Sequence, residues 1–435
     1  MTQLQIELTL GLFAVVVALG VLAEWLRVAY PILLVVAGLL LGLQPWAPDY
    51  SLSPDVVFFL FLPPLLYAAA FNTHWPAFRS QLRAITLLAV GLVVFTAAAV
   101  AAAGHYLLDL PWAVGFVLGA IVSPPDAVAA QAITSRIKVP KIVTTILEGE
   151  SLVNDASALV ALRVAVAAIG ATGFSLWGAV GDFVGVSVGG IAVGLAGAWL
   201  AVRLHRWLAR AELADAKITI AITLLTPFAV YLPAEHLHVS GVLAVVAAGL
   251  WVGSRCEGVF DHDLYVEARA VWEMVEFALN GVIFILIGLQ LPLLLQSLSG
   301  THSLAEVLTA SAGISAVVIV ARIVWVFPGA YLPRWLDRKL YGVGDPYPPW
   351  QNVAVVSWTG MRGVVSLAAA MAIPVAQKDG TPFPHRDAIQ LVTFGVIFAT
   401  LVGQGLTLPL VIRWLKVDEL ADAEREDDDA DEVGC

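Results

Sequence analysis

The sequence is poor in charged residues and in cysteine. Only 13% of its 435 residues are Asp, Glu, Lys or Arg, whereas about a quarter of a soluble protein is charged. The two cysteines, Cys256 and Cys435, are too few for a disulfide framework or a zinc site. These shortages exclude an ordinary soluble enzyme, a coiled coil and a disordered chain. No basic stripe is present either, which argues against nucleic acid as a partner.

Apolar residues are abundant and make up 60% of the chain. They form long unbroken runs such as Ala84–Ala103 and Val307–Pro328. A transmembrane β-barrel would instead show ~10-residue segments that alternate apolar and polar residues. The chain is therefore predicted to be an all-α polytopic membrane protein. No Lys or Arg precedes the first run, so we interpret Ile6–Trp25 as a retained span and not as a signal peptide.

Hydropathy divides the chain into about thirteen transmembrane helices of roughly 20 residues each. The predicted spans are 6–26, 31–44, 54–72, 83–104, 111–134, 140–169, 176–203, 217–232, 239–253, 271–295, 305–332, 350–373 and 387–414. The shortness of 31–44 and 239–253 leaves twelve or fourteen spans open. Residues 1–417 would form the transmembrane domain. The acidic residues 418–435 would form a disordered cytoplasmic tail.

The distribution of basic residues predicts which side each loop faces. With the N-terminus outside, the inward segments carry 18 of the 23 Lys and Arg residues, and the outward loops carry 2. The remaining three, Arg163, Arg322 and Arg362, lie within predicted spans. Because cytoplasmic loops are enriched in Lys and Arg, we expect an external N-terminus and a cytoplasmic C-terminus in the cell membrane.

The fifth predicted span contains an acid beside two consecutive prolines. Pro124 and Pro125 precede Asp126, and each proline removes a helical hydrogen bond and clashes with a carbonyl one turn earlier. Irregular backbone at membrane depth is tolerated only where it lines a cavity or faces protein. A proline kink with a satisfied acid is one explanation, but an ion site at a broken helix is favoured.

The sixth predicted span carries a polar cluster, Glu150, Ser151, Asn154 and Asp155. Helical spacing places Ser151, Asn154 and Asp155 on one face. A polar face could serve only to hold neighbouring helices together. Two acids and an amide exceed that need, because an ionisable group in the bilayer costs at least ~2.5–3.5 kcal/mol. Glu148, near the cytoplasmic end, is expected at the membrane interface.

The twelfth predicted span contains Arg362 between Gly360 and Gly363. The glycines indicate a second interrupted helix. Arginine is always charged, so it requires a buried acid, and the candidates from the residues alone are Glu150 and Asp155. The fifth and twelfth spans would be equivalent in two inverted six-helix repeats joined by the seventh span. Interrupted helices at matching places in two halves point to a transporter site.

At these residues the chain resembles the monovalent cation–proton antiporters, specifically NhaP-like sodium/proton antiporters, which are related to the eukaryotic sodium/proton exchangers. The matching stretches are FLFLPPLLYAAAFN (59–72), SPPDAVAA (123–130), EGESLVNDASALVA (148–161) and WTGMRGVVSLAAA (358–370). The resemblance implies crossed discontinuous helices and a homodimer. It also implies a core at about 83–169 and 305–414, and a dimerisation scaffold at about 6–72 and 176–295.

The resemblance also implies the ion ligands. Asp155 would be the main carboxylate that exchanges the cation for a proton, and Asp126 would be a second acid beside the helix crossing. Ser151 would bind the transported Na⁺ through its side chain, and Pro125 through its backbone carbonyl. Asn154 would orient the site.

Two basic residues and one substitution complete what the resemblance implies. Glu150 and Arg362 would form a structural ion pair, whereas Arg322 has no assigned partner. Some members of the family carry a Glu after the aromatic residue of the LPPLL motif. This sequence has Ala68 there, so the inference about ion selectivity is weaker.

The expected function is secondary active exchange of Na⁺ for H⁺ by alternating access, with Li⁺ or K⁺ as other possible cations. The substrates are the alkali cation and the proton, and no cofactor is expected. Because Asn154 and not a second acid precedes Asp155, one proton would exchange for one cation without net charge transfer, unless Asp126 also titrates. A cation channel is less favoured, since no TVGYG-like filter occurs. An enzyme is not expected, since Gly-x-Ser-x-Gly and His-Glu-x-x-His are absent.

Overall fold

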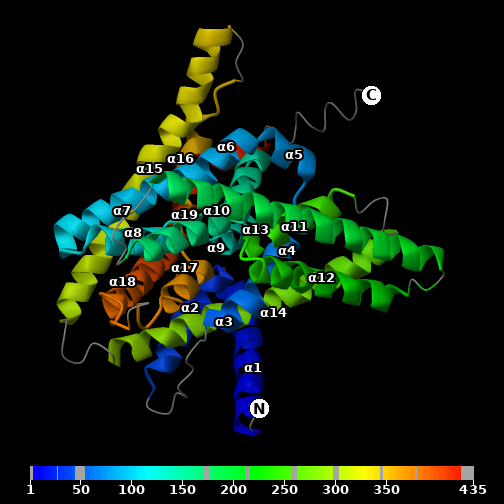
Figure 1. Cartoon of the computed structure of the whole chain (residues 1–435), viewed down its shortest axis with the longest axis horizontal. Helices are drawn as coiled ribbons and strands as arrows, with labels where there is room; N and C mark the ends of the chain where they lie inside the picture. Colours follow the sequence, from blue (N-terminus) through cyan, green and yellow to red (C-terminus); the bar gives the residue numbers. More distant parts are fainter. Residues whose placement is uncertain are drawn as a thin grey trace.

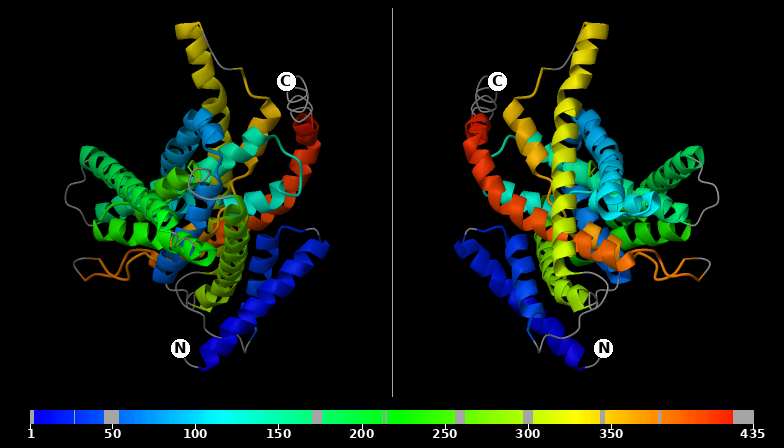
Figure 2. Two further views of the ribbon diagram at one scale, coloured as in Figure 1. Left: turned by 90° about the vertical axis from the view of Figure 1, so that its right-hand side faces the viewer. Right: turned by 90° about the vertical axis from the view of Figure 1, so that its left-hand side faces the viewer.

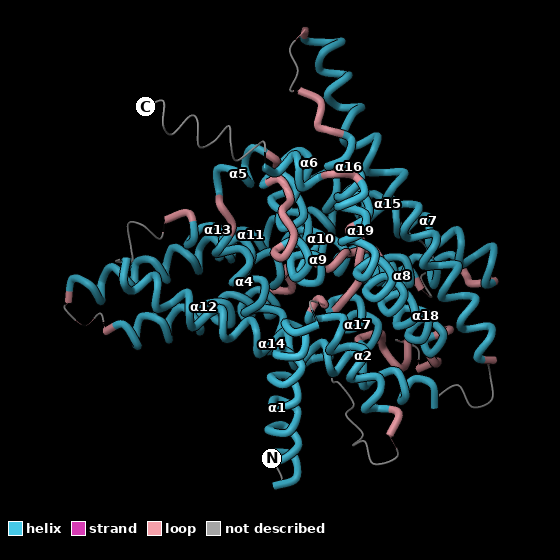
Figure 3. Tube along the Cα trace, turned by 180° about the vertical axis from the view of Figure 1, so that it is seen from behind, coloured by secondary structure: helices cyan, strands magenta, loops and turns pink. Residues whose placement is uncertain are grey.

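The computed structural model describes residues 3–26, 28–44, 54–169, 176–211, 213, 215–255, 262–296, 303–342, 346–377 and 380–422. These ranges are helical apart from short connections and one isolated bridge between Ala376 and Pro382 (Figure 3). The predicted all-α fold is therefore confirmed. Of the predicted acidic tail, residues 423–435 lie outside the described residues, and Asp422 accepts a hydrogen bond from Lys138 at 2.7 Å.

The described helices follow one another along the whole chain (Figure 1). In chain order they are α1 (Gln3–Leu26), α2 (Tyr30–Gly42), α3 (Pro54–Val56), α4 (Leu62–Asn72), α5 (Trp75–Ser80), α6 (Leu82–Thr86), α7 (Val93–Leu108), α8 (Trp112–Val122), α9 (Ala127–Thr134), α10 (Lys141–Ala168), α11 (Leu176–Arg210), α12 (Ala216–His236), α13 (Gly241–Gly253), α14 (His262–Gln296), α15 (Leu304–Tyr341), α16 (Trp350–Trp358), α17 (Val364–Met371), α18 (Arg386–Phe398) and α19 (Gly405–Trp414). Wider π-helical turns at Val57–Phe61, Leu87–Leu92 and Ala399–Gln404 connect α3 to α4, α6 to α7 and α18 to α19.

Many of these helices have the length and composition of membrane spans. Within the described residues, nine helical segments are long and apolar enough to cross a membrane, and three shorter apolar helices lie at Leu10–Leu26, Tyr30–Gly42 and Gly241–Gly253. One of the nine, Trp112–Thr134, contains the break between α8 and α9. The remaining predicted span, 350–373, corresponds to the broken pair α16 and α17. Each predicted segment thus coincides with helix, while the number of membrane crossings stays a prediction.

One group of helices packs around α14 and α13. Helix α2 lies against α14, and α13 contacts both α4 and α11. The approach of α2 to α14 is very close, because a Cβ at Gly38 would lie 2.2 Å from the carbonyl oxygen of Ile285. Glycine is therefore required there. A Cβ at Gly194 of α11 would lie equally near Ala244 of α13, at 2.2 Å from its carbonyl oxygen.

A second group of helices packs around the long helix α15. Helix α15 contacts α7, α16 and α18, and α8 contacts α7 and α10. Figure 2 shows α15 running through most of the height of the molecule, with α1 and α2 at the opposite end from its C-terminus. The buried face of α8 joins side chains from α15, α17 and α18 in one apolar cluster. These helices fall within the predicted core, 83–169 and 305–414.

Both predicted helix interruptions are present. Helix α8 ends at Val122 and α9 starts at Ala127, so the break contains Pro124, Pro125 and Asp126. Helix α16 ends at Trp358 and α17 starts at Val364. The two breaks touch, because the backbone N–H of Asp126 donates to the carbonyl of Met361 at 2.7 Å.

Candidate cation-binding site

Asp126 joins the two interrupted helices. One carboxylate oxygen, Oδ1, accepts a hydrogen bond from the N–H of Val128 at 2.9 Å and so caps α9. The other, Oδ2, accepts from the N–H of Val364 at 3.3 Å, at the start of α17. An acid at a helix N-terminus is stabilised by the free N–H groups and the helix dipole. A Cβ at Gly363 would lie 1.7 Å from Oδ2, which explains why the break requires glycine at this position.

Asp155 lies on α10 beside this crossing and is 6% exposed. Its carboxylate makes no hydrogen bond or ion pair with the described residues, and it interacts electrostatically with Asp126. Ser151, one turn earlier on the same face, accepts a hydrogen bond from the N–H of Ala127 at 3.3 Å. The predicted proximity of Asp126, Ser151 and Asp155 is thus present, and the Asp155 oxygens have their lone pairs available for a ligand.

Asn154 connects α10 to the break in the fifth span. Its Nδ2 donates to the carbonyl of Pro125 at 3.2 Å, and the residue is fully buried. This bond takes one of the two lone pairs of that carbonyl, so the other remains for a ligand. The role of Asn154 in orienting the site stays a prediction.

A cavity of about 90 Å³ is bordered by these groups. Its acidic and hydroxyl lining includes Asp126, Ser151 and Asp155, and the residues of α4 that face it are apolar. Glu148, which the sequence predicts at the membrane interface, also lines the cavity and forms a hydrogen bond with Gln131. The volume is enough for a small cation with a few water molecules.

The buried ion pair of the site is formed by Glu150 and Arg322. Both carboxylate oxygens are engaged, with Nη1–Oε1 and Nη2–Oε2 distances of 2.5 and 2.8 Å. Arg322 also donates from Nε to the carbonyl of Val356 at 3.1 Å, in the last turn of α16. The prediction that Glu150 pairs with Arg362 is therefore wrong. The reason is geometric: Glu150 faces α15, whereas Arg362 lies within the break of the twelfth span.

Arg362 is 0% exposed and is held by its backbone. Its N–H donates to Oγ1 of Thr400 at 3.0 Å. None of its three side-chain nitrogens has a hydrogen-bond partner among the described residues. Its nearest electrostatic neighbours are Arg322 and Glu150, so Arg362 adds positive charge beside an ion pair that is already complete.

Three polar residues of the cavity, Gln131, Asn280 and Ser366, were not predicted from the sequence. Asn280 of α14 and Ser366 of α17 both line it. Asn280 Oδ1 and Ser366 Oγ are buried and have no hydrogen-bond partner in the described part of the chain. Ser366 lies within one of the motifs quoted above. Asn280 is the first amide of α14 and begins no polar cluster, so only its position at membrane depth could have drawn attention to it.

The third-span motif contributes apolar contacts to this site. Ala68, where some members of the family carry Glu, is 1% exposed and packs within the apolar cluster of α4, α11 and α13. Its neighbour Ala69 lines the 90 Å³ cavity. The wall that α4 presents to Asp126 and Asp155 is therefore uncharged.

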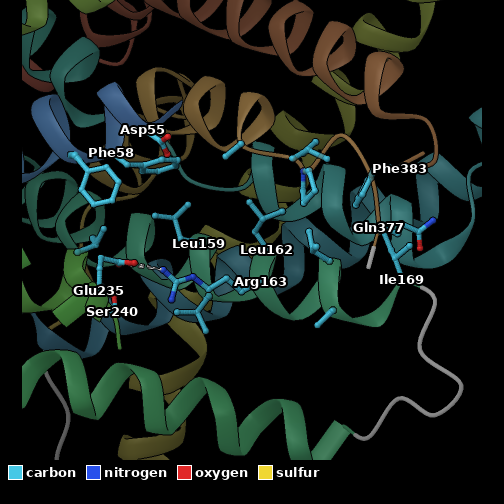
Figure 4. A pocket seen from close by; sticks show the side chains of 18 of the residues that line it. Asp55, Phe58, Leu159, Leu162, Arg163, Ile169, Glu235, Ser240, Gln377 and Phe383 are labelled. Atoms are coloured by element: carbon cyan, nitrogen blue, oxygen red, sulfur yellow. Dashed lines mark hydrogen bonds and ion pairs between the residues drawn. The ribbon is translucent and has the colours of Figure 1, made fainter. Parts of the chain in front are cut away.

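A larger cavity, about 820 Å³, lies further along α10. Leu159, one turn beyond Asp155, lines it together with Asp55 and Phe58 (Figure 4). Figure 4 also shows Arg163 of α10 and Glu235 of α12 pointing toward each other, with an Nη2–Oε2 distance of 3.1 Å. This ion pair connects a helix of the predicted core with a helix of the predicted scaffold.

The architecture matches that of a solved antiporter. A structure of the sodium proton antiporter MjNhaP1 from Methanocaldococcus jannaschii aligns with a TM-score of 0.68, covering 94% of this chain and 99% of that one. At 22% sequence identity this likeness shows a common fold.

Sequence comparisons give the family. The chain is 38% identical over 411 residues to an uncharacterised Na⁺/H⁺ exchanger of Mycobacterium tuberculosis, covering 94% of this chain and 74% of that protein. It is 34% identical to a sodium, potassium, lithium and rubidium/H⁺ antiporter of Bacillus subtilis, covering 88% of this chain and 57% of that protein. Residues 11–414 match the family model described as sodium/hydrogen exchanger, transmembrane. The chain therefore belongs to the sodium/hydrogen exchanger family, whose members are multi-pass membrane transporters and not enzymes.

Proposed function

We propose that this protein exchanges Na⁺ for H⁺ across the cell membrane and that Asp155 is the carboxylate that binds both ions in turn. The observation that supports this best is the state of Asp155. It is buried beside two touching helix breaks and lines a small cavity, yet no described residue donates a hydrogen bond to it. A buried charge is costly without a partner, and either a proton or a cation would neutralise it.

The donor set of the cavity suits an alkali cation. Asp155, Asp126, Ser151 and the Pro125 carbonyl provide only oxygen atoms, which hard cations prefer. Li⁺ and K⁺ have the same ligand preference, and the Bacillus subtilis relative carries both in its name. A K⁺/H⁺ antiporter is accordingly the second candidate.

Exchange follows from competition for one site. A proton on Asp155 removes the negative charge that attracts the cation, and a bound cation disfavours protonation. If the core crosses only with a neutralised site, uptake of one ion requires release of the other. Asp126 is already engaged by two backbone N–H groups. We therefore expect one proton to exchange for one cation, without net charge transfer.

Alternating access would move the core relative to the scaffold. The 90 Å³ cavity lies where the two meet, since Asp155 belongs to α10 and Asn280 to α14. The distribution of basic residues supports an external N-terminus and a cytoplasmic C-terminus. Under that orientation the 820 Å³ cavity opens toward the outside. We also propose that the scaffold helices mediate a homodimer.

The test is transport in proteoliposomes with the membrane potential clamped. Addition of Na⁺ should drive H⁺ movement in the wild type, and a potential alone should not. Asp155→Asn should abolish the exchange while the protein keeps its elution profile in detergent. Exchange that persists in this variant would assign the site to another residue. Na⁺ flux without H⁺ countertransport would instead indicate a channel.

A further inference from the structure

We propose that Asn280 of α14 is a ligand of the transported cation, contributed from the scaffold side of the site. The inference rests on the proposed function, because it requires a cation between Asp126 and Asp155. It extends that function by naming a residue outside the core. With such a ligand, the affinity of the site for the cation depends on the position of the core relative to α14.

The position of Asn280 is fixed by close helix packing. Helix α14 contacts both α4 and α17. The residue after Asn280 is Gly281, where a Cβ would lie 2.2 Å from Cγ1 of Val16 and 2.4 Å from the hydroxyl oxygen of Tyr30. Tyr30 in turn donates its hydroxyl hydrogen to the carbonyl of Phe277 at 2.8 Å. This part of α14 is therefore held firmly against α1 and α2 while Asn280 lines the ion cavity.

The amide oxygen of Asn280 lacks a protein partner. Oδ1 is buried and accepts no hydrogen bond from the described residues. A buried acceptor left unsatisfied is unfavourable. A cation in the cavity, or the water molecules that replace it, would supply the missing interaction.

Asn280 differs from the rest of the scaffold lining. The other scaffold residues that face the cavity within the described ranges are apolar: Leu62, Leu65, Leu66 and Ala69. The acidic and hydroxyl groups come from α10, α17 and the break before α9, all within the predicted core. A cation held by the core thus meets one scaffold oxygen donor, and this donor is neutral. The ligand adds affinity without changing the number of charges exchanged.

A scaffold ligand makes cation affinity dependent on conformation. When the core moves away from α14, the core ligands move with it and Asn280 stays behind. The cation then loses one oxygen, which favours its release on the other side of the membrane. Proton affinity depends on the carboxylates and would change less, because an amide does not titrate.

The experiment measures Na⁺-dependent H⁺ flux in proteoliposomes over a range of Na⁺ concentrations. Asn280→Leu has nearly the same volume but no oxygen, and Asn280→Asp keeps the oxygen and the shape. We expect the Leu variant to raise the KM for Na⁺ by about tenfold or more, with a maximal rate within about twofold of the wild type. The Asp variant should keep the wild-type KM or lower it.

Asn352 provides the matched control. It is also an asparagine with a buried Oδ1 that no described residue satisfies, but it lines a different cavity. Asn352→Leu should therefore leave the KM for Na⁺ unchanged. If Asn280→Leu does not fold, Asn280→Ala replaces it, since Ala fits any site that accepts Asn.

The outcomes separate this inference from the proposed function. A wild type without Na⁺-driven H⁺ flux would overturn both. A wild type that exchanges, with a folded Leu or Ala variant of unchanged KM, would overturn only the role of Asn280. Tolerance of Leu together with damage from Asp would show a packing role and would also reject the ligand assignment.

Discussion

Arg322 and Glu150 form a buried ion pair in which both carboxylate oxygens are engaged and both side chains are 1% exposed. The pair links α10, which carries Asp155, to α15. Through Arg322 Nε it also satisfies a carbonyl at the end of α16. A single guanidinium, that of Arg322, therefore holds both the helix that carries Asp155 and one half of the broken twelfth span.

Removal of Arg322 should destabilise the protein strongly. Arg322→Gln leaves Glu150 charged and buried, which costs about 3–5 kcal/mol. We expect a clearly lower melting temperature in detergent, and a smaller loss when Glu150→Gln is combined with it. Arg269→Gln is the control, because the Arg269–Glu273 pair is exposed and such pairs contribute little. Equal effects of the two single substitutions would argue against a structural role for the buried pair.

Neutralisation of Asp126 should separate its structural and ionic roles. Asp126→Asn keeps an oxygen that can cap α9 but loses the charge. We expect the variant to fold and to bind Na⁺ more weakly, by on the order of tenfold in KM. Its exchange should remain insensitive to membrane potential. If wild-type exchange generates a current that this variant abolishes, Asp126 titrates and the one-to-one stoichiometry is incorrect.

A methyl group at position 363 should disrupt the crossing of the broken helices. Gly363→Ala places a Cβ that would lie 1.7 Å from Oδ2 of Asp126, so the capping carboxylate must move. Exchange should fall to below about a tenth of the wild-type rate. The control is Gly313→Ala on α15, where a Cβ meets nothing within 4 Å. Full activity of Gly363→Ala would show that the contact between the breaks is not needed for transport.

The Arg163–Glu235 ion pair should affect the equilibrium between the conformations of the proposed alternating-access cycle. It joins α10 to α12 and is partly exposed, so its contribution is about 0.2–1 kcal/mol. We expect Arg163→Gln to change the KM for external Na⁺ by at most about fivefold, with the fold unchanged. The charge reversal Arg163→Glu with Glu235→Arg should restore the wild-type value. Failure of that reversal to restore the KM, after a clear effect of the single variant, would exclude the pair as the cause.

The helix breaks could be predicted from the sequence because their causes are local. Two prolines before Asp126, and two glycines around Arg362, disturb a helix wherever it is placed. The partner of Glu150 could not be predicted in this way. It depends on how α10 and α15 are rotated against each other, and the sequence offered two buried arginines. The resemblance implied Arg362 as the partner, and the structure places Arg322 there instead.

The proposed ligands of the core and of the scaffold also differ in how far they could be predicted. Asp126, Ser151 and Asp155 lie in dense polar clusters that apolar helices do not need. Asn280 belongs to no such cluster in α14, and only the cavity that it shares with these residues points to a role for it. Ala68 and Ala69 show the reverse case, since the missing acid of α4 was evident from the motif.

The double capping by Asp126 limits how this transporter could acquire a new ion preference. One side chain both caps two half-helices and lines the 90 Å³ cavity, so a longer acid at position 126 would push those helix ends apart. A change of selectivity toward larger or smaller ions would then have to come from the opposite wall of the cavity, at positions such as Ala69 and Asn280. Substitutions there leave the two capped helix ends unchanged.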